Sequence, residues 1–153
     1  YVGKMIEFYL GESPILNNVP TYPCREAEAL DYVIAHLDQL VVKEAQGSGG
    51  YGMLIGPQAS MQQIEAFKLK LIANPHHYIA QPTLALSVAP TITETGIAER
   101  HIDLRPFVLS SPFRTEIVPG GLTRVAMQPN SLVVNSSQGG GIKDTWVVDT
   151  LHS

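Results

Sequence analysis

The chain has 153 residues, of which 44% are hydrophobic and 16% charged, and its formal net charge is −4. This composition excludes an intrinsically disordered chain, and the length suits one ordinary domain or two small lobes. The acidic balance disfavours a nucleic-acid backbone or an anionic membrane as the main partner, and no window approaches the ~20 apolar residues of a membrane span.

The single cysteine, Cys24, excludes an intramolecular disulfide, so we expect a reducing, cytoplasmic compartment. A lone cysteine can be a nucleophile, but a small buried hydrophobe is its more usual role. The chain begins at Tyr1 without methionine and stops at Ser153 soon after an apolar run, so we expect a piece of a longer protein. Such a piece would expose apolar surface, and it could form a homo-oligomer.

The first half of the chain is predicted to hold two main helices and a β-hairpin. Residues 1–24 are interrupted by glycine, prolines and asparagines, and they are interpreted as a connecting segment. Apolar residues recur at helical spacing over 25–40, which predicts the first helix. The second helix begins with a capping box at Ser60 and Gln63 and ends at the Asn74-Pro75 pair. Two short strand-like runs, 40–45 and 53–55, lie between these helices.

The second half is predicted to be rich in β-strands. Short strand-like pieces at 77–81 and 83–87 precede residues 90–100, which we interpret as a surface loop. Further strands are expected at 101–109, 115–118, 122–127, 131–135 and 145–148. Helices followed by a mostly antiparallel sheet predict the α+β class, and the order does not fit a doubly wound parallel sheet.

A glycine-rich segment, Gly47-Ser48-Gly49-Gly50-Tyr51-Gly52, joins the two strands of the predicted hairpin. It matches G-x-G-x-x-G, but that fingerprint marks a dinucleotide site only where the last glycine opens a helix, and here a strand-like run follows. It is not a P-loop either, because no Lys-Ser/Thr pair follows the glycines. The pattern favours a hairpin tip whose backbone N–H groups approach phosphates without hindrance from Cβ atoms.

Lys43 supports this interpretation, since it is the only lysine or arginine between Arg25 and Lys68 and follows two valines. A lysine in a segment built for burial needs an anionic partner or a route to water. The alternative is an edge-strand lysine that reaches solvent beside an ordinary loop. The pattern alone does not separate the two.

Polar residues that suit phosphoryl transfer recur in the β-rich half. Asp103 and Arg105 lie two apart in one strand and therefore project from the same face. Further along the chain are Arg124, Asn135, the glycines Gly139, Gly140 and Gly141, and Lys143. Cations and close backbone donors are what a developing phosphoryl charge requires. The alternative is a surface ion pair and a plain hairpin. His76-His77 has no nearby carboxylate or cysteine at ligand spacing, so no metal site is predicted.

Taken together, these segments resemble the circularly permuted ATP-grasp proteins, including members likened to glutathionylspermidine synthases. The resemblance covers nearly the whole chain, and it rests on the stretches Tyr9–Tyr22, Leu40–Lys43, Gly47–Gly52, Tyr78–Pro82, Asp103–Val108, Gly120–Ala126 and Asn135–Asp144. It implies an ATP-binding portion of a longer protein, with 25–87 as a nucleotide-clamp lobe and 88–153 as a β-rich phosphate-side lobe.

The resemblance also implies a role for each matching residue. Lys43 would contact the α- and β-phosphates, and Gly47–Gly52 would close over them. Ile79, Ala80 and Gln81 would form a hinge strand that meets the adenine edge largely through its backbone. The phosphoryl group would be stabilised by Arg105 and Arg124, in a pocket also lined by Asn135, Gly139–Gly141 and Lys143.

Family members activate a carboxylate as an acyl phosphate and pass it to an amine or thiol acceptor. They use Mg²⁺, commonly held by a Glu-x-Asn segment, which this chain lacks: Val133-Val134-Asn135 has the asparagine without the acid. The main Mg²⁺ ligands are therefore expected outside the chain, and we expect little turnover by the chain alone. The alternative is a non-catalytic module of the same fold that binds a nucleotide or another protein.

Overall fold

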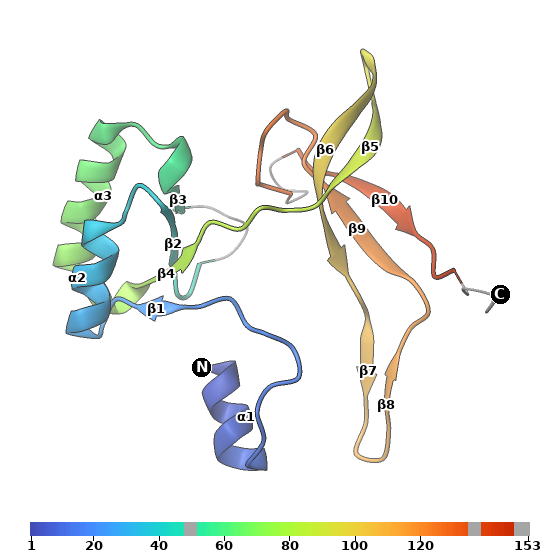
Figure 1. The fold of residues 1–153 in the computed structure, drawn as a ribbon, viewed down its shortest axis with the longest axis horizontal. Coiled ribbons are helices and arrows are strands. Elements are labelled where there is room, and N and C mark those ends of the chain that lie inside the picture. Colours follow the sequence, from blue (N-terminus) through green and yellow to red (C-terminus); the bar gives the residue numbers. More distant parts are fainter. Residues whose placement is uncertain (48–51, 135–138, 149–153) are drawn as a thin grey trace. The chain divides into compact units, whose positions relative to one another are not determined.

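The computed structural model describes residues 1–47, 52–134 and 139–148, and the chain divides into two units, Tyr1–Leu84 and Ala85–Ser153. The described residues form three α-helices, two short 3₁₀ helices and small sheets (Figure 1). Every strand pair among them is antiparallel. The predicted α+β class is therefore confirmed.

Unit 1 (Tyr1–Leu84) contains all three α-helices and one four-stranded sheet of order β1-β4-β2-β3. In chain order its elements are α1 (Val2–Leu10), β1 (Tyr22–Pro23), α2 (Ala27–Ala35), β2 (Leu40–Glu44), β3 (Leu54–Ile55), η1 (Gly56–Gln58), α3 (Met61–Ala73), η2 (Pro75–His77) and β4 (Tyr78–Pro82). Strands β2 and β3 pair at Val42 and Leu54, so the predicted β-hairpin is confirmed.

The helix boundaries follow local capping chemistry. The Ser60 hydroxyl accepts a hydrogen bond from the Gln63 N–H, and the Gln63 side chain accepts one from the Ser60 N–H, which confirms the predicted capping box of α3. Helix α2 is shorter than predicted because His36 leaves the helical conformation, and the strand β2 begins at Leu40. Helix α1 was not predicted. It ends at Gly11, whose φ of 65° is a left-handed cap that favours glycine.

The core of unit 1 lies between the sheet and the helices α2 and α3. Val42 and Ala80 are fully buried in the two central strands, and Val33 and Leu71 are fully buried on the two helices. Figure 1 shows α2 and α3 side by side on one side of this sheet. The other face of the sheet is therefore left available for a site.

Unit 2 (Ala85–Ser153) consists of β-strands in its described part. Its elements are β5 (Val88–Thr93), β6 (Gly96–Arg105), β7 (Val108–Ser110), β8 (Thr115–Ile117), β9 (Gly121–Val125) and β10 (Gly141–Thr145). Four of them form a sheet of order β10-β9-β6-β5, and β7 pairs with β8 in a separate hairpin.

Some predicted strands of unit 2 were wrong. Residues 90–100 are not a surface loop, because β5 and β6 form a hairpin there and Gly96, at a φ of 116°, supplies its turn. The predicted strand 101–109 is divided by Pro106, which has no N–H for a ladder. Residues 83–87 and 131–134 are not strands, and β10 lies ahead of the predicted strand 145–148.

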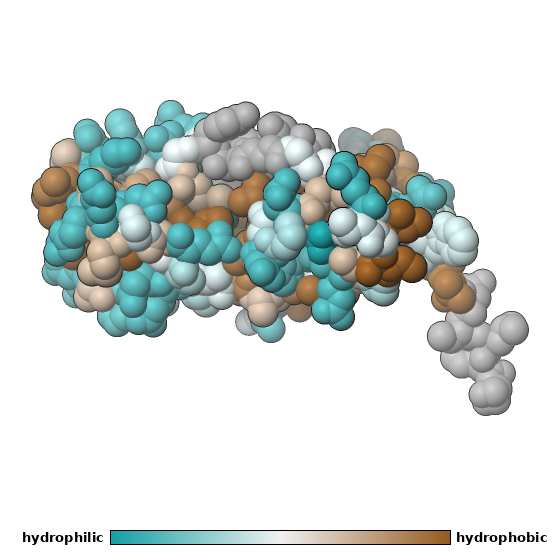
Figure 2. All heavy atoms as spheres, turned by 90° about the horizontal axis from the view of Figure 1, so that it is seen from above, coloured by the Kyte–Doolittle hydropathy of each residue, from teal (hydrophilic) through white to brown (hydrophobic). Residues whose placement is uncertain are grey.

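Apolar side chains are also present on the surface. In Figure 2, brown hydrophobic side chains interrupt the teal hydrophilic ones on the face shown. In unit 1 they include Phe8, Tyr9 and Leu10 of α1, and in unit 2 Phe113 of the β7–β8 turn is 98% exposed. The homo-oligomer stays a prediction. Within the described residues, no helix is both long and apolar enough to cross a membrane.

Candidate functional site

The register of the unit 1 sheet places three predicted site residues on one face. Lys43 of β2 lies directly opposite Ile79 of β4, and Val41 lies opposite Gln81. Directly opposed residues of antiparallel strands project from the same face, and so do residues two apart. Lys43, Ile79 and Gln81 therefore share the face that looks away from the helical core.

Ala80 lies between these residues and points to the other face. It is fully buried opposite Val42, inside the core that the sheet shares with α2 and α3. Of the three predicted hinge residues, it is therefore the one whose side chain is removed from the candidate site. Its backbone is also enclosed, because β4 pairs on both sides, with Tyr22 of β1 and Val42 of β2 opposite Ala80.

Lys43 is half-buried, and its ammonium takes part in none of the ion pairs or hydrogen bonds formed among the described residues. Burying even part of a cationic group without a counter-ion costs free energy. A bound anion would remove this cost, and polyphosphate would fit the requirement. The surroundings of Lys43 therefore fit a polyphosphate ligand such as ATP.

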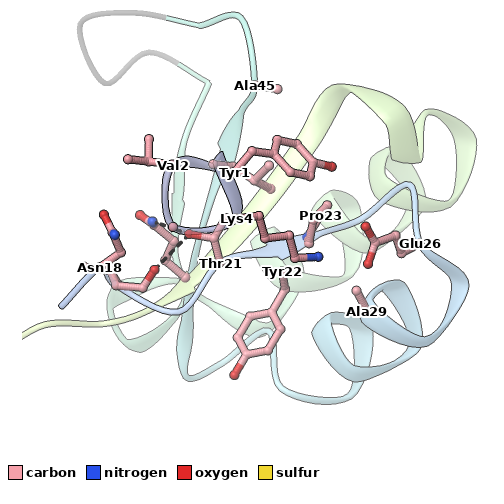
Figure 3. Close-up of a pocket in the computed structure, with 14 residues that line it drawn as sticks. Tyr1, Val2, Lys4, Asn18, Thr21, Tyr22, Pro23, Glu26, Ala29 and Ala45 are labelled. Atoms are coloured by element: carbon pink, nitrogen blue, oxygen red, sulfur yellow. Dashed lines mark hydrogen bonds between the residues drawn. The ribbon is translucent and has the colours of Figure 1, made fainter. Parts of the chain in front are cut away.

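A pocket of about 850 Å³ opens on the same side of the sheet. Ile79 and Gln81 line it, together with Ala45, Thr21 and the first residues of α1 (Figure 3). Its volume lies in the range of small-molecule sites. Lys43 lies beside Ile79 on this face without lining the pocket itself.

The side chain of Gln81 is held by a chain of hydrogen bonds. Its Nε2 donates to the Thr21 Oγ1 at 2.8 Å, and the Thr21 Oγ1 donates to the Val19 carbonyl at 3.0 Å. Figure 3 shows Thr21 between the connecting segment and the sheet, with dashed lines at its hydroxyl. Sequence reasoning missed Thr21, because only the register of β1 against β4 brings it next to Gln81.

The two described ends of the glycine-rich segment both approach Glu44. A Cβ on Gly47 would lie 3.0 Å from the Glu44 Cβ, and a Cβ on Gly52 would lie 3.2 Å from the Glu44 Oε1. Gly52 also has a φ of 69°, which favours glycine. Glycine at these two positions thus has a local structural reason. The predicted site residues Ser48, Gly49, Gly50 and Tyr51 lie outside the described residues.

In unit 2, the structure brings Asp103, Arg105 and Arg124 to one face of the sheet. Arg124 of β9 lies directly opposite Asp103 of β6. The Arg105 Nε and Nη2 donate to the Asp103 Oδ2 at 3.0 and 2.8 Å. This hydrogen bond raises the pKa of Arg105, because the carboxylate stabilises the charged guanidinium. The two arginines therefore lie on one face of the sheet, with the Asp103 carboxylate next to both of them.

Lys143 does not join these arginines. It lies opposite Thr123, one residue from Arg124, and so projects from the other face of the sheet, where its ammonium donates to the Pro90 carbonyl. Gly139 and Gly140 lead into β10, whose first residue is Gly141. A Cβ on Gly141 would lie 2.8 Å from the Met127 sulfur, so a larger residue there would displace the Met127 side chain. Asn135 lies outside the described residues.

Cys24 belongs to the hydrophobic core of unit 1. Cys24 is 1% exposed, and its burial raises the pKa of the thiol to about 11. A protonated buried thiol is a poor nucleophile, which fits the structural role. Within the described ranges, no three histidine, cysteine, aspartate or glutamate side chains gather as metal ligands. The expectation that the main Mg²⁺ ligands lie outside this chain stays a prediction.

Comparisons with known proteins find relatives that match nearly the whole chain. An uncharacterized protein of Synechocystis sp. is 54% identical over 148 residues, which are 97% of this chain and 31% of that protein. An uncharacterized protein of Mycobacterium tuberculosis is 47% identical over 148 residues, or 97% of this chain and 27% of that protein. A Frankia alni protein named "Putative glutamate--cysteine ligase 2-3" is 47% identical over 147 residues, or 96% of this chain and 17% of that protein.

The chain thus spans less than a third of the length of these relatives. The family model "Circularly permuted ATP-grasp type 2" matches residues 1–126, which include both strands of the hairpin, the strand β4 and the two arginines. The ATP-grasp family implies ATP binding. The chain belongs to the circularly permuted ATP-grasp type 2 family.

Proposed function

We propose that this chain is the ATP-binding portion of a carboxylate–amine or carboxylate–thiol ligase. The observation that carries the proposal is the shared face of Lys43, Ile79 and Gln81, which places a cation of β2 directly beside two side chains of β4. Lys43 would bind the α- and β-phosphates, and β4 would meet the adenine edge. This assignment gives the half-buried cation the counter-ion that the described residues do not supply.

Arg105 and Arg124 would stabilise the transferred phosphoryl group. In the proposed reaction, a carboxylate oxygen of the substrate attacks the γ-phosphorus, and ADP leaves. An amine or thiol then attacks the acyl carbon of the acyl phosphate, and inorganic phosphate leaves. Two guanidinium groups on one face of a sheet suit this chemistry, because positive charge positioned beforehand stabilises the transition state without reorganisation.

The carboxylate and its acceptor are proposed only by class. The Frankia alni relative is named after a glutamate–cysteine ligase, so glutamate and cysteine are the first pair to supply. This chain matches only 17% of that relative, so we expect turnover to require other parts of the full-length protein. The chain alone is expected to bind ATP and to release little ADP.

The proposal is tested by isothermal titration calorimetry with ATP and Mg²⁺ on three proteins. These are the wild-type chain, Lys43→Ala and the control Lys68→Ala, whose lysine is also half-buried but lies on α3 across the core. A charge-assisted hydrogen bond is worth about 1.5–3 kcal/mol, so Lys43→Ala should weaken ATP binding roughly 10- to 100-fold. Lys68→Ala should bind ATP like the wild-type chain.

Adenosine provides a second control. It lacks the phosphates, so Lys43→Ala should leave its binding unchanged. If ATP does not bind, or if both lysine variants weaken it equally, the proposed site is wrong. If ATP binds as expected but adding glutamate and cysteine to the full-length protein releases no ADP beyond the background, this pair is not the substrate. ATP binding without turnover on any carboxylate would favour the non-catalytic module.

A further inference from the structure

The hydrogen bonds at Thr21 determine which way the Gln81 amide faces. A threonine hydroxyl has one hydrogen to donate, and Thr21 donates it to the Val19 carbonyl at 3.0 Å. Towards Gln81, therefore, Thr21 can only accept. The group that Gln81 turns to Thr21 must be its NH₂, which is the 2.8 Å contact in the structure.

The amide oxygen is what remains for a ligand. Among the described residues, nothing donates a hydrogen bond to the Gln81 Oε1, although Gln81 lines the pocket. The exposed group of this side chain is thus a hydrogen-bond acceptor. This polarity is set by Thr21 and Val19 and not by Gln81 itself, which could turn either way on its own.

We propose that Gln81 is a specificity-determining residue that selects adenine over guanine, and that Thr21 is the residue that positions it. The inference rests on the proposed nucleotide site. Adenine carries an amino group at C6, which donates to an amide oxygen, as in the pairing of glutamine with adenine. Guanine carries a carbonyl oxygen there, which meets the Gln81 oxygen as acceptor against acceptor.

Guanine would bind well only after the amide turned over. That change would break the bond to Thr21, or it would force Thr21 to turn its hydrogen away from Val19. One hydrogen bond near the surface would be lost in either case, which corresponds to a preference for ATP over GTP of roughly three- to tenfold. The preference is therefore modest, and it depends on a residue that does not touch the base.

A simple structural role for Thr21 is the competing explanation. The hydroxyl could serve only to tie the connecting segment to β4. In that case, removing it would weaken ATP and GTP binding alike or lower the stability of unit 1. A change in the ratio of the two affinities is expected only if Thr21 orients the amide.

The experiment measures dissociation constants for ATP and GTP by calorimetry in the wild-type chain, Thr21→Val, Thr21→Ser and Gln81→Met. Thr21→Val frees the amide to turn, so GTP should bind tighter and the ATP/GTP preference should fall to about one. Thr21→Ser keeps the hydroxyl and should restore the preference. Gln81→Met removes both hydrogen-bonding groups and should lose the preference mainly through weaker ATP binding.

Thr83→Val is the matched control. The Thr83 hydroxyl also donates to a backbone carbonyl, that of Gln39 at 3.0 Å, but it does not contact Gln81. This variant should keep the wild-type preference. Far-UV circular dichroism of each variant shows whether it is folded, and Gln81→Met carries the test if Thr21→Val does not fold, because a wild-type preference in that variant would overturn the inference.

Equal changes in ATP and GTP affinity for Thr21→Val would overturn the inference. A wild-type chain that binds both nucleotides equally would also overturn it, while leaving the proposed ATP site standing if Lys43→Ala weakens both. If neither nucleotide binds, the proposed function fails and this inference fails with it.

Discussion

Gly56 is the position at which one added methyl group should disturb unit 1 most. It follows β3 and lies against the turn between α2 and β2. A Cβ there would lie 1.9 Å from the Leu37 carbonyl oxygen and 2.8 Å from the Leu40 carbonyl oxygen. Both neighbours are backbone atoms, so a change of side-chain rotamer cannot relieve the overlap.

The cost of Gly56→Ala follows from this geometry. Cβ atoms essentially never come within 3.0 Å of another heavy atom, so the turn or the hairpin must move by at least about 1 Å. Leu37 and Leu40 are buried core residues, and their displacement disturbs packing. Overpacking of this kind costs typically 1–3 kcal/mol, and we expect the upper part of this range because the clash involves the backbone.

Urea unfolding followed by circular dichroism at 222 nm measures this cost. The three α-helices of the described structure all lie in unit 1, so the helical signal reports on that unit. With a slope near 1 kcal/mol per molar urea, the midpoint should fall by roughly 2–3 M. Gly11→Ala is the control: its φ is 65° but nothing lies within 4 Å of the added Cβ, so it should cost only about 1–2 kcal/mol of backbone strain. A Gly56→Ala midpoint equal to that of the wild-type chain would refute the reasoning.

Two further predictions concern titratable groups. Burial raises the pKa of Cys24 to about 11, so above pH 9 the unfolded thiol loses its proton while the folded one keeps it. The free energy of unfolding should then fall by about 1.4 kcal/mol per pH unit between pH 9 and 11, relative to that of Cys24→Ala. A difference in urea midpoint between the two proteins that stays constant over this pH range would contradict this. Asp103→Asn should change stability by no more than about 1 kcal/mol, because the ion pair is partly exposed. It should nevertheless speed hydrogen exchange at the Arg105 Nε–H, measured by NMR, and an unchanged exchange rate would show that Asp103 does not hold the guanidinium.

The parts of the fold that were predictable are those controlled by neighbouring residues. The capping box at Ser60 and the hairpin around the glycines follow from short-range chemistry, and both are present. The hairpin at 88–105 was missed because Gly96 alone marks its turn. Helix α1 was missed because it has no capping side chain at its N-terminus and buries none of its residues. Both the hairpin and the helix α1 therefore lack a strong local signal in the sequence.

In the candidate site, too, some residues could be placed from the pattern of a single strand, whereas others could be placed only from the pairing of strands. Asp103 and Arg105 could be placed together from the alternation of a single strand, and their hydrogen bonds confirm this. Arg124 and Lys143 could not be sorted in this way, because their faces depend on how β9 and β10 pair with β6. That register places Arg124 beside Asp103, whereas a shift of one residue would exchange its face with that of Thr123. Thr21 could not be predicted for the same reason, because the pairing of β1 with β4 brings it next to Gln81. The proposed preference for adenine thus depends on a residue that no local motif indicates.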